Sequence, residues 1–348
     1  MVFLSHYPHP PEHHHLAMLL AMGRVGLLLF FVLSAYLITE LLLREREATE
    51  TIHIGFFFLR RILRIWPLYF LAILLAIWFS PLFPALPFSP HALPYLFLLS
   101  ANLFVARHGW LLGLIGPLWS ISVEEQFYLV IPSVVRSFGV TGLRNLAILC
   151  IAMSYATLAW LAHQPATPID RPWINSFVQF QFFAAGTLIA ITLHRRRWSP
   201  SWAARISLLL GGFLLIYIVD LTLHPVEQGI PASQLCAGYA GLLSGTLAIF
   251  LSFVSAPLRP PGALVYLGKI SFGLYVFHTF TISFAVLGYK KLQHAGVHLP
   301  FHPRGAADPA GHHWNRRPLL PILRAAHPPR EREDRLHQEQ TSACGVVV

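Results

Sequence analysis

The chain has 348 residues, of which 55% are hydrophobic and only 11% are charged, and its formal net charge is +10. Because soluble proteins carry about 25% charged residues, this composition excludes an ordinary soluble domain and indicates a polytopic membrane protein. The arginines lie in short clusters beside apolar runs, which is typical of cytoplasmic membrane flanks, so we expect no nucleic-acid partner.

The N-terminal region predicts a partial first span followed by an external loop. Residues 1–5 resemble the last turn of a helix whose beginning is missing, and residues 7–15 are rich in proline and histidine. Adjacent histidines without an acid or cysteine at ligand spacing predict no metal site. His6 directly follows the apolar fragment, and an imidazole suits general base work on a hydroxyl, although a lone histidine is more often structural.

Apolar segments of about 20 residues, the length that a bilayer requires, recur along the chain and predict an all-α, polytopic transmembrane helix bundle. If every segment crossed, the basic loops 44–64 and 195–197 would lie on opposite faces, against the positive-inside rule. We therefore expect 92–106 not to span. The segments lie at 26–43, 66–79, 92–106, 117–136, 143–163, 175–194, 206–222, 235–255 and 264–289.

The composition changes after about residue 299. Residues 300–348 are polar, rich in proline, histidine and arginine, and lack a usable period, so they predict a disordered tail. We expect a membrane domain over 1–299. In this topology the tail would lie on the extracytoplasmic side, although the positive-inside rule places its many arginines on the cytoplasmic side. We therefore hypothesise that a last span has been lost here, for example through a frameshift.

The stretch LWSISVEEQFYL, residues 118–129, places two acids in an apolar chain. An ionised carboxylate at membrane depth costs about 2.5 kcal/mol or more, so such acids are shielded by partners or used in chemistry. Ser122 and Glu125 match a capping box at the start of a helix, which gives Glu125 a structural explanation. The topology puts this stretch at the outer entrance of its span.

Glu124 shares one helical face with Ser120 and Tyr128, four residues to either side. Such a polar stripe on an apolar helix is expected to face the bundle interior or a water-filled cavity. The alternative is a hydrogen-bonded network with a purely structural role. We interpret Glu124 as the stronger functional candidate of the two acids.

Arg61 and Arg64 lie three residues apart at the cytoplasmic membrane boundary, opposite the acidic stretch in the predicted topology. The arginine fork binds phosphate bidentately, so the pair is a candidate for holding a cytoplasmic cofactor. From the residues alone, an anchor that sets the topology is the favoured interpretation.

The stretch from Gly268 to Phe280 holds two further candidates, Lys269 and His278. Lys269 lies near the cytoplasmic start, and His278 follows about 14 Å along a helix, which predicts a position near mid-membrane. A buried polar side chain there is a functional hypothesis, against the alternative of one interhelical hydrogen bond.

Four stretches together resemble the acyltransferase 3 family of integral membrane O-acyltransferases, and their order and spacing also match over about residues 1–290. They are GRVGLLLFFVLSAYLIT (23–39), FFFLRRILRIWPLYF (56–70), LWSISVEEQFYL (118–129) and LGKISFGLYVFHTF (267–280). The chain departs from the family at Leu28 and Ala35 and in its first and last spans.

The resemblance implies about ten transmembrane helices, in a bacterial inner membrane, that transfer an acyl group, commonly acetyl from acetyl-CoA, to a carbohydrate or other extracytoplasmic hydroxyl. It implies that Arg61 and Arg64 lie near the acyl-CoA donor, that His6 is the base, and that Glu124 is the acid of the site. No permanently bound cofactor is implied. The alternatives are a transporter of polar lipids or saccharides and an inactive membrane scaffold.

Overall fold

The computed structural model describes residues 23–83, 88–110, 114–165, 171–196, 198–225, 229–254 and 260–294. The predicted base His6, the first-span fragment and the tail 300–348 lie outside these residues. Within the described ranges every regular element is a helix, and none is a strand. The prediction of an all-α chain is therefore confirmed.

Seven helices of the described part are long and apolar enough to cross a membrane. Their outward faces carry large apolar side chains such as Leu63, Trp78 and Leu210, as expected for contact with lipid. The prediction of a polytopic membrane bundle is confirmed. The seven are α3 (Arg24–Thr49), α4 (Ile54–Phe79), α7 (Leu118–Ala162), α9 (Ser176–Leu193), α10 (Trp202–Thr222), α11 (Ala232–Phe253) and α12 (Gly262–His294).

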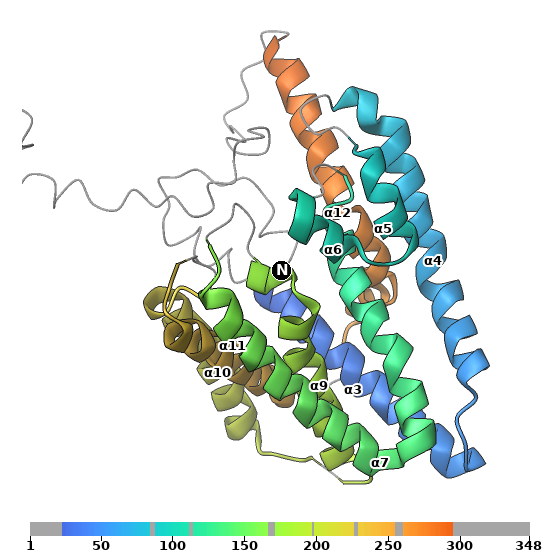
Figure 1. Ribbon diagram of the computed structural model, residues 1–348, viewed down its shortest axis with the longest axis vertical. Coiled ribbons are helices and arrows are strands. Elements are labelled where there is room, and N and C mark those ends of the chain that lie inside the picture. The colour runs from blue at the N-terminus through green and yellow to red at the C-terminus, as the bar shows by residue number, and fades with distance from the viewer. Residues whose placement is uncertain are drawn as a thin grey trace, which may run out of the picture. The chain divides into compact units, whose positions relative to one another are not determined.

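Helix α7 combines the two spans that the sequence predicts at 117–136 and 143–163. Its 45 residues would extend about 68 Å if straight, twice the thickness of a bilayer core. Gly139 interrupts it with φ 63° and ψ −155°, a conformation that favours glycine, and in Figure 1 the two halves leave this bend in different directions. A Cβ at Gly139 would lie 2.2 Å from the Arg46 guanidinium. The bend therefore makes one helix serve as two crossings.

The segment 92–106 is divided between short helices: η2 (Pro90–Ala92), α5 (Leu93–Phe97) and α6 (Ala101–His108). The longest of them extends only about 12 Å, too short for a span. The turn between α5 and α6 is sharp, with Leu99 at φ 51°. This geometry agrees with the expectation that the segment does not cross the membrane.

A closed set of hydrogen bonds joins α6 to the start of α9. The Asn102 side chain donates to the Ser176 hydroxyl at 2.8 Å and accepts from Gln126 of α7 at 3.0 Å. The Ser176 hydroxyl in turn donates to Gln126 at 2.6 Å. Since each amide and hydroxyl here has a partner, the network fixes the short helices and leaves no unsatisfied group at these side chains. The remaining short elements are η1 (Ser80–Leu82) and α8 (Arg171–Ile174).

Helix α3 contacts its neighbours closely both at its first turn and midway along its length. At its first turn, Arg24 forms an ion pair with Asp220 of α10 at 2.9 Å. Midway, it approaches α9 so closely that a Cβ at Gly186 would lie 2.3 Å from the Val32 carbonyl oxygen. Small residues allow such close backbone contact between membrane helices. Helix α3 therefore has little freedom to move relative to α9.

Candidate active site

The predicted polar stripe of α7 faces the interior of the bundle. Ser120, Glu124 and Tyr128 are all buried, with at most 3% of each residue exposed. The Tyr128 hydroxyl donates a hydrogen bond to the Glu124 carboxylate, and the Ser120 hydroxyl is hydrogen-bonded to the Tyr275 hydroxyl of α12. The four-residue spacing explains the contact within α7, because residues four apart lie one turn above each other.

The capping-box interpretation of Ser122 and Glu125 is wrong. Helix α7 already begins at Leu118 after Pro117, so Ser122 lies in the second turn. Its hydroxyl donates to the Leu118 carbonyl at 3.2 Å and accepts from the backbone N–H of Ala101 at 3.0 Å. Glu125 is free of a capping role and is buried against α4, where the Trp66 indole N–H lies close to it without normal hydrogen-bond geometry.

Arg61 lies beside the acidic stretch, whereas the sequence predicted the arginines opposite it. Its Cζ is 4.8 Å from the centroid of the Tyr128 ring and 5.8 Å from that of Phe57. The guanidinium interacts electrostatically with Glu124 and Glu125. The prediction from topology was wrong on this point because α4 packs against α7 in a way that brings Arg61 level with Tyr128.

Arg64 has different surroundings from Arg61. Three residues further along α4, it is exposed, while Arg61 is half-buried. A separation of three residues rotates a side chain by about 60° around the helix, which is enough to move it from the interior to the surface. The structure therefore places Arg61 at the buried cluster and Arg64 on the exposed surface of α4.

Two hydroxyl groups that sequence reasoning missed complete the cluster. Ser34 of α3 is buried, donates to the Phe31 carbonyl at 3.1 Å, and approaches both the Glu124 carboxylate and the Tyr128 hydroxyl. Tyr275 of α12 contacts Ser120 and donates to the Pro117 carbonyl at 3.4 Å. Both residues lie in stretches on which the family resemblance rests, 23–39 and 267–280, but nothing in their local sequence tells which helix they face.

The two α12 candidates occupy different environments. His278 is buried, and its Nδ1 donates to the Tyr275 carbonyl at 2.6 Å. Because Thr279 donates to the Leu114 carbonyl at 2.6 Å, His278 lies level with the first turn of α7 and not midway along it. Lys269 is exposed, about 14 Å further back along α12. His278 thus belongs to the cluster's outer end, while Lys269 is outside the cluster.

Within the described part of the chain, the buried Glu124 is surrounded by hydroxyl groups, and Arg61 lies nearby. Among the described residues, neither Glu124 nor Glu125 has an ion-pair partner within 4.0 Å. A carboxylate desolvated in this way is poorly stabilised, so it is available to accept or donate a proton or to hold a substrate hydroxyl. The arrangement is suited to acid–base chemistry on a polar acceptor.

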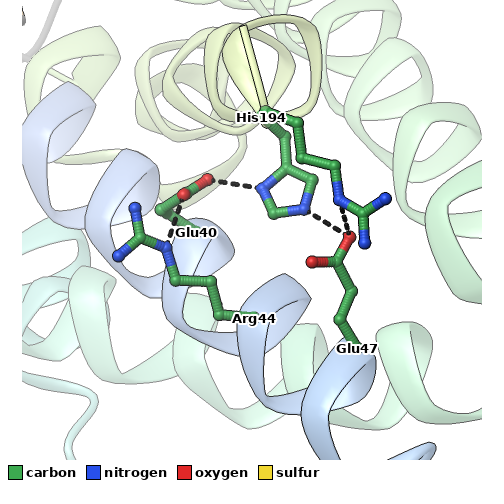
Figure 2. A network of polar contacts seen from close by, with 5 residues as sticks. Glu40, Arg44, Glu47 and His194 are labelled. Atoms are coloured by element: carbon green, nitrogen blue, oxygen red, sulfur yellow. Dashed lines mark hydrogen bonds and ion pairs between the residues drawn. The ribbon is translucent and has the colours of Figure 1, made fainter.

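A second group of charged side chains lies near the C-terminal end of α3 (Figure 2). His194, at the end of α9, bridges two acids of α3: its Nδ1 is 2.9 Å from Glu40 and its Nε2 is 2.7 Å from Glu47. Arg44 and Arg195 neutralise the same carboxylates at 2.7 and 2.8 Å. Burial lowers the pKa of His194, but the hydrogen bonds to Glu40 and Glu47 outweigh it and raise that pKa above 6.5. This network ties α3 to α9.

The chain shows clear similarity to known sequences. The profile of the acyltransferase 3 family, described as an acyltransferase domain, matches residues 1–306. The peptidoglycan O-acetyltransferase OatA of Listeria monocytogenes is 28% identical over 196 residues, covering 51% of this chain and 31% of that protein. The O-acetyltransferase OatA of Staphylococcus aureus is 25% identical over 289 residues, covering 76% of this chain and 47% of that protein.

The chain thus spans less than half the length of these two relatives. No solved structure matches it significantly.

Proposed function

We propose that this chain, which belongs to the acyltransferase 3 family, transfers an acetyl group to a hydroxyl of an extracytoplasmic carbohydrate. It is an integral membrane protein with helices of spanning length, and its relatives are bacterial O-acetyltransferases. The proposed donor is acetyl-CoA from the cytoplasm, and the proposed acceptor is a sugar hydroxyl of a cell-wall glycan.

One observation carries this proposal: Glu124 is 3% exposed, is hydrogen-bonded to Tyr128, and has no ion-pair partner within the described ranges. A structural role would favour a neutralised carboxylate, because an unpaired buried charge is costly. Hydroxyl donors around the acid resemble the groups of a sugar, so an acceptor hydroxyl can replace one of them. This supports an acid that orients or polarises the acceptor.

In the proposed reaction the acceptor oxygen attacks the thioester carbonyl, the C–S bond breaks, and CoA leaves as the thiol with the proton of the acceptor hydroxyl. His6 is the proposed base for this proton, with Glu124 as its partner or as the group that polarises the acceptor. Arg61 is proposed to stabilise negative charge next to Glu124 and Glu125, and Arg64 to contact the donor at the helix surface. General base help is typically worth about 10²–10⁴-fold in rate.

The test is transfer of labelled acetyl groups from acetyl-CoA to soluble peptidoglycan fragments by the full chain reconstituted in lipid vesicles. His6→Ala should lower transfer about 100-fold or more while leaving membrane insertion intact. The matched control is His53→Ala, because His53 is exposed between α3 and α4, away from the cluster. Transfer that survives His6→Ala would show that His6 is not the base, and absence of transfer by the unmodified chain would refute the proposed function.

A further inference from the structure

A cavity of about 480 Å³ opens beside the charged network at the end of α3. It lies where α3, the bend of α7 and the end of α9 meet, on the side that the positive-inside rule assigns to the cytoplasm. Its volume falls within the range of small-molecule sites. The lining residues are Leu43, Arg46, Glu47, Phe138, Gly139, Val140, Thr141 and His194.

The charge of the lining favours an anion. Glu47 is the one acid among the lining residues, and His194 and Arg195 already neutralise it. Arg46 is half-buried, has no ion-pair partner among the described residues, and donates from Nη1 to the Val135 carbonyl at 2.8 Å. A guanidinium has five N–H donors in a fork that matches phosphate, so most of the donors of Arg46 remain for a ligand.

The bend of α7 adds neutral donors to the same wall. Gly139 breaks the helix, and the second half restarts at the lining residues Val140 and Thr141. Amide groups in the first turn of a helix lack intrahelical partners and favour anions. The Thr141 hydroxyl supplies a further donor, and Leu43, Phe138 and Val140 supply apolar surface for a ring or chain. The cavity therefore combines phosphate donors with apolar walls.

We propose that this cavity binds the phosphate groups of the acyl-CoA donor, with Arg46 as the main charged contact. The proposal rests on the proposed acetyl-CoA donor, and it assigns the phosphates to α3 and α7, since Arg61 is engaged with Tyr128 and the two acids. Arg46 follows Ser34 by twelve residues, about 18 Å along α3. The extended pantetheine arm of CoA spans such a length, so the thioester reaches the cluster around Glu124.

The test measures CoA binding to the full chain in nanodiscs of zwitterionic lipid. Val140→Glu places a negative charge in the cavity wall at a residue that is 41% exposed, so the substitution removes no core side chain, and thermal unfolding of the variant checks its fold. We expect a Kd for CoA at least about tenfold weaker, and a similar loss for Arg46→Gln, because charge-assisted phosphate contacts are among the stronger hydrogen bonds. Thr51→Glu, exposed on the same side but outside the lining, is the control and should leave Kd within about twofold.

Two outcomes would overturn the proposal. One is an unchanged Kd in Val140→Glu and Arg46→Gln, or an equal loss in Thr51→Glu. The other is that Val140→Glu reduces only the retention of phosphatidylglycerol in mixed nanodiscs, which would make a lipid headgroup the occupant.

The transfer assay separates this proposal from the proposed function. In Val140→Glu, KM for acetyl-CoA should rise while kcat at saturating donor is kept. CoA binding that depends on the cavity without any acetyl transfer would refute the proposed function and support the site. Transfer with an unchanged KM in Val140→Glu would support the proposed function and refute the cavity as the donor site.

Discussion

The two charged regions of this protein treat their carboxylates in opposite ways. In the network of Figure 2, Glu40 and Glu47 each bond to His194 and to an arginine at 2.7 to 2.9 Å. In the cluster on α7, Glu124 and Glu125 are buried more deeply, and the described residues around them offer hydroxyl groups, an indole N–H and the more distant Arg61. Paired acids at the end of α3 hold helices together, whereas unpaired acids inside the bundle are costly and indicate chemistry.

The largest expected effect that sharpens this contrast comes from Glu124→Gln. Glutamine keeps the size and an acceptor for Tyr128, so the fold should persist, but the side chain can no longer carry a charge or move a proton. We expect acetyl transfer to fall about 100-fold or more. Labelled acetyl transfer in vesicles measures the loss, and Glu40→Gln is the matched control because Glu40 belongs to the structural network. Equal losses in both variants would contradict the contrast.

A smaller effect is expected from Arg61→Gln compared with Arg64→Gln. Arg61 lies near two buried carboxylates without forming an ion pair with either, and its loss should lower transfer about tenfold, which corresponds to about 1.4 kcal/mol in the barrier. Arg64 is exposed, and its loss should change transfer by less than about threefold. Initial rates at saturating acetyl-CoA measure both losses, and rates over a range of acetyl-CoA concentrations give the KM of each variant. If the two substitutions had the same effect on the KM for acetyl-CoA, the arginines would act as a pair on the donor, as the sequence suggested.

The smallest expected effect concerns pH and the His194 network. The folded-state pKa of His194 is raised above 6.5 by Glu40 and Glu47, although burial opposes it. The stabilisation that protonated His194 gives to the folded state is therefore fully present below the pKa of His194 in the unfolded chain. It is lost as the pH rises through the raised pKa of the folded state. Between about pH 6 and pH 9 we expect the apparent Tm to fall by roughly 2 °C more in the unmodified chain than in His194→Gln. Thermal scans at one fixed rate measure it, and identical pH profiles would exclude His194 as the titrating link.

The candidate site could be predicted from the sequence only in part. The stripe of Ser120, Glu124 and Tyr128 could be predicted because helical periodicity alone puts these residues on one face. The contacts of Arg61 and Ser34 with this stripe could not, because they depend on which helices pack together and at what height. The capping box failed for a related reason: the motif fits, but α7 begins four residues earlier, at Leu118.

The sequence by itself determined the membrane class, the helices and most of their limits, because a chain in lipid must satisfy its backbone hydrogen bonds within each apolar segment. It also determined the family through the order of its motifs. Only the tertiary structure decided that α7 bends at Gly139, that Arg61 lies beside the acids, and that Arg46 lines a cavity. These features depend on how the helices pack against one another in space, which one-dimensional periodicity does not contain.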